Sequence, residues 1–301
     1  IPLVFMIHGL GGEGEDNYFF SSLANDSCFM VVFPSGMFNT WNAGPLMPFA
    51  HDINDNSYYD ALIDTIYNNY PLDTNRVYLT GHSMGGFMAS HMNCTSTSFT
   101  AYGGSGGGIA SGYTIGNGFE DLCSVENGTY PNPMIITHGM ADNIVPFEWA
   151  IFNLYHFLLL NRCDGITPWP YDYDWPIFSD TGYYWEDPED DLEEIIDYVF
   201  SIADTTSYYP GLLERYQWSN GCLGGQAALE AIMLPNEQHA WHQTWNSQIE
   251  SQLEHWNFLK QFSKAEMGPI LDSLALPVSE ILDEDYYVNG ETTTIGILAI
   301  D

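Results

Sequence analysis

The chain has 301 residues, 45% of them hydrophobic and 15% aromatic, so it is long enough to bury a core and is not a disordered chain. Its 40 acidic residues outnumber its 5 basic ones, which gives a formal net charge of −35 with histidine neutral. Because phosphate contacts require cations, this charge argues against nucleic acids and anionic membrane surfaces as partners.

Short apolar runs alternate with helical stretches through the first half of the chain. This order predicts an α/β fold with a mostly parallel central sheet and helices on both faces. Strands are expected at residues 2–7, 29–33, 76–80, 100–110 (with the loop that follows), 133–137 and 228–234. Helices are expected at residues 58–69, from the turn at 81–86 through 92, at 148–160 and at 245–262.

Two features of the chain bear on its location. The longest apolar run, at residues 150–160, is too short to cross a bilayer and is interrupted by Asn153 and His156, so we interpret it as a buried helix. The sequence opens inside an apolar strand at Ile1 rather than at a methionine, so we expect further residues to precede it.

Composition divides the chain into four parts. Residues 1–163 and 222–264 are expected to form the two parts of the α/β core. Residues 164–221 mix aromatic, acidic and proline residues, and we interpret them as a lid over the carboxyl edge of the sheet. The alternative is a surface excursion that packs on itself. Residues 265–301 have no helical period and are predicted to be a C-terminal extension or a linker.

The cysteines do not indicate a metal site. None of the 5 is part of a Cys-x-x-Cys pair or a Cys/His cluster with zinc spacing, and an odd count permits two disulfides and one free thiol. Asn25, Asn93 and Asn127 each open an Asn-x-Ser/Thr glycosylation pattern. We therefore expect a secreted protein without a metal. Its charge is that of an ordinary acidic secreted protein or of one adapted to a saline medium.

A nucleophile elbow is the clearest motif in the chain. Residues 81–85 read G-H-S-M-G, which matches G-x-S-x-G between an expected strand and an expected helix. This turn raises the Ser83 hydroxyl above the sheet and directs free helix N–H groups at a reacting carbonyl. A serine hydroxyl is a weak nucleophile, so it needs a base within hydrogen-bond reach.

The partners of such a serine follow it along the chain as an acid and then a histidine, each after a later strand. Asp142 follows the strand at 133–137, and His239 follows the strand at 228–234. His242, one turn further on, is the rival base. Weaker alternatives are those that no apolar strand precedes or that lie in the elbow itself: Asp121, Asp180, His51, His255 and His82.

An oxyanion hole requires two N–H donors. One should be the backbone N–H of Met84, directly after the nucleophile. The other should come from the loop after the first strand, H-G-L-G-G at residues 8–12, at Leu10. Because only the backbone is used, the Leu10 side chain is free to line an acyl pocket.

Several segments together resemble the secreted polyhydroxybutyrate-depolymerase and feruloyl-esterase group of α/β-hydrolases. They match in the right order from residue 1 to about 262: 3–9 (LVFMIHG), 31–34 (VVFP), 40–44 (TWNAG), 54–63 (NDNSYYDALI), 73–83 (DTNRVYLTGHS), 138–142 (HGMAD), 145–146 (VP), 221–222 (GC) and 239–241 (HAW). The resemblance implies hydrolysis of carboxylic esters through an acyl-enzyme, without a metal or an organic cofactor.

The resemblance also implies disulfides Cys94–Cys123 and Cys163–Cys222, with Cys28 free, the alternative being that some are buried thiols. It places Trp41 beside the acyl pocket, where the alternative is an ordinary core tryptophan. Candidate substrate contacts are Trp41, Val145, Trp185 and Trp241. The family's Trp-Pro-Gly after the histidine reads Trp-His-Gln here, which keeps His242 as a rival.

These observations predict a monomeric, secreted serine esterase acting on feruloyl or aryl esters or on polyesters, aromatic ones included. A polyhydroxyalkanoate depolymerase is the alternative, and a peptidase or lipase shares the same triad. From another class, a non-catalytic binding protein with the same fold remains open.

Overall fold

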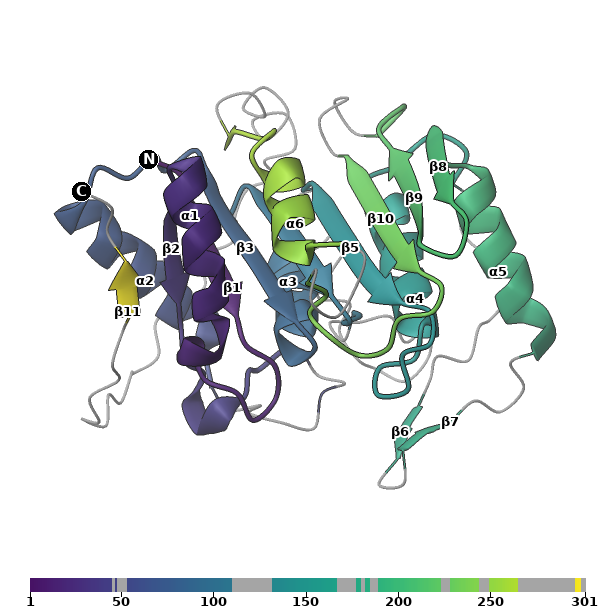
Figure 1. The fold of residues 1–301 in the computed structure, drawn as a ribbon, viewed down its shortest axis with the longest axis horizontal. Helices are drawn as coiled ribbons and strands as arrows, with labels where there is room; N and C mark the ends of the chain where they lie inside the picture. The colour runs from purple at the N-terminus through teal and green to yellow at the C-terminus, as the bar shows by residue number, and fades with distance from the viewer. Residues whose placement is uncertain are drawn as a thin grey trace, which may run out of the picture.

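A single large sheet organises the structure, a computed structural model that describes residues 1–44, 47, 53–109, 132–166, 177–179, 182–184, 189–222, 228–243, 249–264 and 296–298. Nine strands of the described residues form it in the order β11-β2-β1-β3-β4-β5-β10-β9-β8 (Figure 1). The strands β2 (Met30–Phe33), β1 (Leu3–Ile7), β3 (Val77–His82), β4 (Ala101–Ser105), β5 (Met134–Gly139) and β10 (Leu229–Leu234) lie parallel to their neighbours. They overlap the six strands predicted from the sequence.

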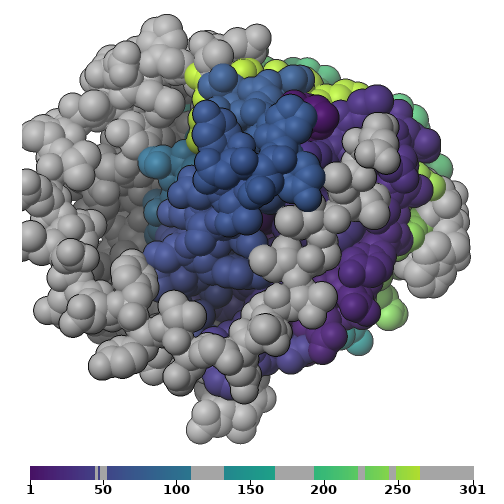
Figure 2. Space-filling view, turned by 90° about the vertical axis from the view of Figure 1, so that its left-hand side faces the viewer, coloured from purple at the N-terminus to yellow at the C-terminus, as the bar shows by residue number. Residues whose placement is uncertain are grey.

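These central strands are buried on both faces, as a parallel sheet covered by helices should be. One core cluster includes apolar side chains of α2 (Asp55–Asn69), α3 (Met84–Thr95), α4 (Glu148–Leu160) and α5 (Glu189–Ser201). The opposite cluster includes side chains of η1 (Gly14–Phe20), α1 (Ser21–Ser27) and α6 (Ser251–Leu259). Figure 1 shows α1 and α6 in front of the sheet, and Figure 2 views the molecule from the side that carries α2.

The segment interpreted as a lid is partly sheet. Its strands β8 (Thr205–Tyr209) and β9 (Leu213–Trp218) run antiparallel and extend the main sheet beyond β10. The turn between them begins at Pro210, whose ring cannot continue a strand ladder. The short hairpin of β6 (Ile177–Ser179) and β7 (Gly182–Tyr184) also falls in this segment, whereas residues 167–176 lie outside the described residues. The lid interpretation is therefore wrong for residues 205–218.

The C-terminal extension contributes β11 (Gly296–Leu298), which pairs antiparallel with β2 at the other edge of the sheet. This matches neither a linker nor a strand pair of its own. Among the described helices, none combines the length and the apolar character that crossing a bilayer requires.

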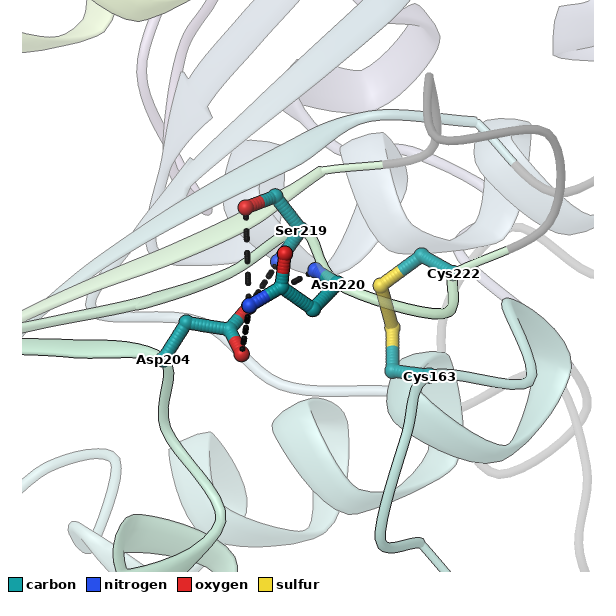
Figure 3. The surroundings of a disulfide bond; sticks show 5 residues. All are labelled: Cys163, Asp204, Ser219, Asn220 and Cys222. Atoms are coloured by element: carbon teal, nitrogen blue, oxygen red, sulfur yellow. Dashed lines mark hydrogen bonds between the residues drawn. A yellow bond between two sulfur atoms is a disulfide. The ribbon is translucent and has the colours of Figure 1, made fainter.

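The predicted disulfide Cys163–Cys222 is confirmed, and Cys28 is free and exposed as expected. The disulfide joins the turn after α4 to the turn after β9 (Figure 3). Beside it, the Asp204 carboxylate accepts hydrogen bonds from the backbone N–H groups of Ser219 and Asn220 at 2.6 and 2.7 Å. Cys94 is disulfide-bonded, and Cys123, its expected partner, lies outside the described residues.

Candidate active site

Ser83 occupies a sharp turn between β3 and α3. Its backbone has φ 56° and ψ −121°, a region that non-glycine residues rarely adopt and that persists where the surroundings hold it. The turn is so tight that a Cβ on Gly85 would lie 2.5 Å from the Ile7 carbonyl oxygen of β1. Because no side chain fits there, the elbow needs glycine at that position.

Asp142 and His239 meet across their two loops. The Nδ1 atom of His239 lies 2.6 Å from the Asp142 Oδ2 atom, and Asp142 is buried. The other carboxylate oxygen, Oδ1, accepts hydrogen bonds from the backbone N–H groups of Ile144 and Val145, both at 2.9 Å. The carboxylate is thus held by its own loop on one side and bonds the imidazole on the other.

The turn after β4 connects Ser83 to this pair. The Ser83 N–H donates to the Ser105 carbonyl at 2.8 Å, and the next residue, Gly106, lies against the His239 ring. A Cβ on Gly106 would be 3.3 Å from both the Cε1 and the Nδ1 atoms of His239. The structure therefore brings the elbow, the imidazole and the carboxylate to one part of the sheet's carboxyl edge.

The loop after β1 lies against the nucleophile. A Cβ on Gly9 would be 3.2 Å from the Ser83 Cβ and 3.7 Å from its hydroxyl oxygen. The Met84 N–H, at the first position of α3, has no acceptor within its helix, and the Leu10 N–H has none among the described residues. Both predicted oxyanion donors are thus unpaired beside Ser83.

His8 and Trp41 hold this loop in place. The His8 Nε2 atom accepts the Gly36 N–H at 2.9 Å, so the proton of the neutral ring is on Nδ1, which donates to the Gly9 carbonyl at 2.7 Å. The Trp41 Nε1–H donates to the His8 carbonyl at 3.0 Å. Burial lowers the pKa of His8, which favours the neutral ring that this arrangement requires.

Comparison with known proteins identifies esterases as relatives, although no protein-family model matches the chain. The chain is similar to the bifunctional acetylxylan esterase/xylanase XynS20E of Neocallimastix patriciarum, with 26% identity over 153 residues, or 49% of this chain and 20% of that protein. It is also similar to the "Probable feruloyl esterase C" of Aspergillus terreus, with 27% identity over 175 residues, or 54% of this chain and 57% of that protein. The chain thus matches only a fifth of the first relative's length and just over half of the second's.

Among solved structures, the acetyl xylan esterase from Aspergillus awamori superimposes with a TM-score of 0.55 at 15% identity, covering 86% of this chain and 88% of that one. The chain has an α/β-hydrolase fold. The predicted fold class is confirmed, and at this level of identity the likeness shows the fold alone.

Within this hydrolase fold, the rival residues have other partners. The Nδ1 atom of His242 lies 3.8 Å from a Glu237 carboxylate oxygen, and no contact joins His242 to Asp142 at hydrogen-bond distance among the described residues. His255 hydrogen-bonds two threonine hydroxyls instead of a carboxylate. The weaker alternatives His51, Asp121 and Asp180 lie outside the described residues.

The electrostatics of the hydrolase site favour an ionised acid. Burial raises the pKa of Asp142, but the His239 hydrogen bond and the two loop N–H groups outweigh it, so the pKa lies below its usual value. His138, whose Nε2–H donates to the Val145 carbonyl at 2.9 Å, also lies 3.5 Å from Asp142; burial lowers its pKa to about 4, so it stays neutral. No group of three metal-binding side chains occurs in the described part of the chain.

The candidate substrate contacts lie beneath the surface of the hydrolase site. Trp41 is 0% and Trp241 8% exposed, and Val145 is buried beside Asp142. Trp41 is thus the core tryptophan of the alternative interpretation, and direct contact with substrate is not what its position provides. Trp185 lies outside the described residues.

Sequence reasoning missed the apolar side chains that are exposed at this edge. They are Leu10 and Met37–Phe38 on the loops after β1 and β2, and Met140 and Ile144 on the loop after β5. We call these five residues the apolar rim. Only the Leu10 side chain was expected near the site, because exposure of the others depends on how the loops pack.

Proposed function

We propose that the chain is a serine esterase in which Ser83 is the nucleophile, His239 the base and Asp142 the acid. The observation that carries the proposal is the 2.6 Å contact between the His239 Nδ1 and Asp142 Oδ2 atoms, next to a strained serine elbow. A carboxylate at Nδ1 fixes the tautomer that leaves Nε2 free to accept a proton.

In the proposed reaction, the Ser83 hydroxyl oxygen attacks the ester carbonyl carbon while His239 Nε2 takes the hydroxyl proton. The N–H groups of Leu10 and Met84 stabilise the negative charge on the former carbonyl oxygen. The C–O bond to the alcohol then breaks, and His239 protonates the departing alcohol oxygen. Water, deprotonated by His239, attacks the acyl-enzyme, and the free acid leaves as Ser83 regains its proton.

The apolar rim supports an uncharged, apolar ester as substrate. Strand β3, which leads to Ser83, lies between β1 and β5 in the sheet, so the rim residues flank the nucleophile on both sides. Phe38 is 82% exposed and has φ 57°, a left-handed backbone conformation that is costly for a bulky residue. The Asn39 N–H donates to Gly36 and the Asn39 carbonyl accepts from Gly11, so this outward-facing ring is held on a bonded turn.

These features favour feruloyl, other aryl and polyester substrates, because the net charge of −35 repels anionic ones. A polyhydroxyalkanoate is the alternative. The relatives' names include acetylxylan and feruloyl esters, so acetylated xylan belongs in the same assay. We also infer that the protein works in an oxidising, extracellular compartment, since disulfides persist there.

The decisive experiment uses Ser83→Ala. We expect a fluorophosphonate probe to label the wild-type protein at Ser83 and not the variant, and turnover of 4-nitrophenyl esters to fall by at least about 1,000-fold. Circular dichroism checks that the variant is folded. An unlabelled wild-type protein would instead support the non-catalytic binding protein, and retained turnover in the variant would refute the assignment.

The substrate is tested with methyl ferulate, acetylated xylan, a polyester film and a polyhydroxyalkanoate film. Phe38→Ser should raise KM for methyl ferulate or slow film hydrolysis. Tyr67→Ser is the matched control, because Tyr67 is also exposed but lies near the C-terminal end of α2, far along the helix from the loops of the rim. Equal effects of the two substitutions would remove Phe38 from the substrate surface.

A further inference from the structure

A continuous series of ring contacts runs from α6 to His239. The rings of His255 and Trp241 are 5.1 Å apart in a T-shaped arrangement, and those of Trp241 and His82 are 6.4 Å apart in another. The rings of His82 and His239 are 4.7 Å apart and tilted by 39°. These four side chains come from three separate segments of the chain, and we call them the ring stack.

His255 anchors the ring stack to the strands that lead into the site. Its Nδ1 atom lies 2.6 Å from the Thr80 hydroxyl of β3, and its Nε2 atom lies 3.1 Å from the Thr137 hydroxyl of β5. The ring fits because β4 has no side chain at Gly103, where a Cβ would lie 2.5 Å from the His255 Nδ1 atom. Burial lowers the pKa of His255 to about 3, so this anchor stays neutral.

Trp241 is held on several sides. Its Nε1–H donates to the Gln252 Oε1 atom at 3.2 Å, and its ring packs against Phe19 and Phe20 at 6.2 and 6.5 Å between ring centres. A ring confined in this way is a firm wall for His82. Trp241 also lies two residues after His239, so it fixes the backbone of the loop that carries the imidazole.

His239 needs a second restraint besides Asp142. One hydrogen bond at Nδ1 leaves the imidazole free to tilt about that bond, and small misplacements of a reacting group are costly in rate. The His82 ring faces the imidazole and restricts the tilt. The buried His82 Nε2 atom has no hydrogen-bond partner among the described residues, so ring contact, and not hydrogen bonding at that atom, is what His82 provides.

We propose that Trp241 is a positioning residue for His239, acting through His82, with His255 as its anchor. This inference rests on the proposed esterase function. It assigns Trp241 to the orientation of the base and not to contact with substrate, so it predicts an effect on kcat and not on KM.

The test compares Trp241→Leu with Trp241→Phe in the full chain. Leucine removes the ring, so kcat on a 4-nitrophenyl ester should fall by about ten- to hundredfold with KM within about twofold of wild type. Phenylalanine keeps a ring and should restore most of kcat. Trp218→Leu is the matched control: Trp218 is buried in β9 and stacks with Phe200 and Tyr216, so its loss should lower stability and leave kcat unchanged.

Wild-type kcat in Trp241→Leu, or a raised KM with kcat unchanged, would overturn the proposal. If Trp241→Leu does not fold, His82→Val and His82→Phe carry the same contrast, because His82 is only partly buried as a residue. An independent readout is the ¹⁵N NMR titration of the His239 ring. Altered His239 signals in a protein without esterase activity would sink the proposed function and keep the positioning role, whereas unchanged signals would refute the positioning role.

Discussion

Three histidines near the sheet edge differ in what their ring nitrogens contact, and these contacts determine what each ring can do. His8 bonds two backbone groups and therefore supports a loop. His255 contacts two hydroxyls and stays neutral in the core. Only His239 has a carboxylate at 2.6 Å, which stabilises an imidazolium when it forms. Partner identity, and not burial alone, selects the candidate base.

The two histidines that remained possible bases are tested by His239→Asn and His242→Asn. The first should lower kcat/KM by about 10⁴-fold, because asparagine cannot accept the serine proton. The second should stay within about threefold of wild type, since His242 lies beside Glu237 and not Asp142. Steady-state kinetics on one soluble ester measure both. The reverse ranking would move the base to His242.

Asp55 offers a prediction on pH. Its buried carboxylate accepts the Asn42 N–H at 2.7 Å, yet burial dominates and raises its pKa to about 6. A raised carboxyl pKa means that the folded state binds the proton more tightly, so stability falls as the pH rises through about 6. Asp55→Asn carries no charge and should therefore gain stability relative to wild type between pH 4 and pH 8, by up to about 2 kcal/mol.

Urea unfolding of wild type and Asp55→Asn at the two pH values measures this difference. Asp64→Asn, which removes an exposed carboxylate from the same helix, is the control. A difference between wild type and Asp55→Asn that is the same at pH 4 and pH 8 would show that burial of the charge costs nothing.

At the scale of elements, the central strands were predictable because parallel strands buried on both faces read as continuous apolar runs. Helix α2 begins three residues earlier than predicted, because the Asn54 side chain accepts the Ser57 N–H and caps it. Strands β8 and β9 were missed because β8 is a largely exposed edge strand and carries no apolar run. Its pairing with β9 becomes visible only in the folded sheet.

The same limit applies to the candidate site. Ser83, Asp142 and His239 could be proposed from sequence because each follows a strand, and parallel strands end at one edge. The exposure of Phe38 depends on its positive φ and on the bonds between two loops, which no local pattern encodes. For the same reason, the burial of Trp41 and Trp241 could not be read from their residue types.

The Cys163–Cys222 disulfide ties α4 to the β9 edge of the sheet. It closes a span of 59 residues, for which the loss of chain entropy in the unfolded state predicts a stabilisation of about 4 kcal/mol. The double variant Cys163→Ser/Cys222→Ser should lose about 2–4 kcal/mol in urea unfolding. It should keep kcat/KM, because the loops of Ser83, Asp142 and His239 follow other strands. Cys28→Ser, which removes the exposed free thiol, is the control, and a matching loss there would argue against a role of the disulfide.

At the scale of the whole molecule, the net charge of −35 is the largest unbalanced term. The basic side chains are few and occupied: Arg76 pairs with Asp73, Arg215 with Glu230 and Glu254, and Lys264 donates to the carbonyls of Thr97 and Ser98. Most acidic side chains therefore have no basic group to balance them, and their mutual repulsion opposes the compact state. Repulsion of this kind is long-ranged, so it is the contribution that dissolved salt changes most.

Added salt should therefore raise the unfolding temperature. Because the screening length falls from about 30 Å at 0.01 M to about 8 Å at 0.15 M, most of the rise should occur below about 0.3 M NaCl. A rise that continues towards 1 M or beyond would favour a saline habitat over an ordinary acidic protein, since simple screening is then already complete. Scanning calorimetry in NaCl and KCl measures the rise, and sucrose at matched osmolality controls for effects that do not depend on charge. An unchanged midpoint in both salts would mean that folding has already placed the acidic groups far enough apart for their repulsion to be negligible.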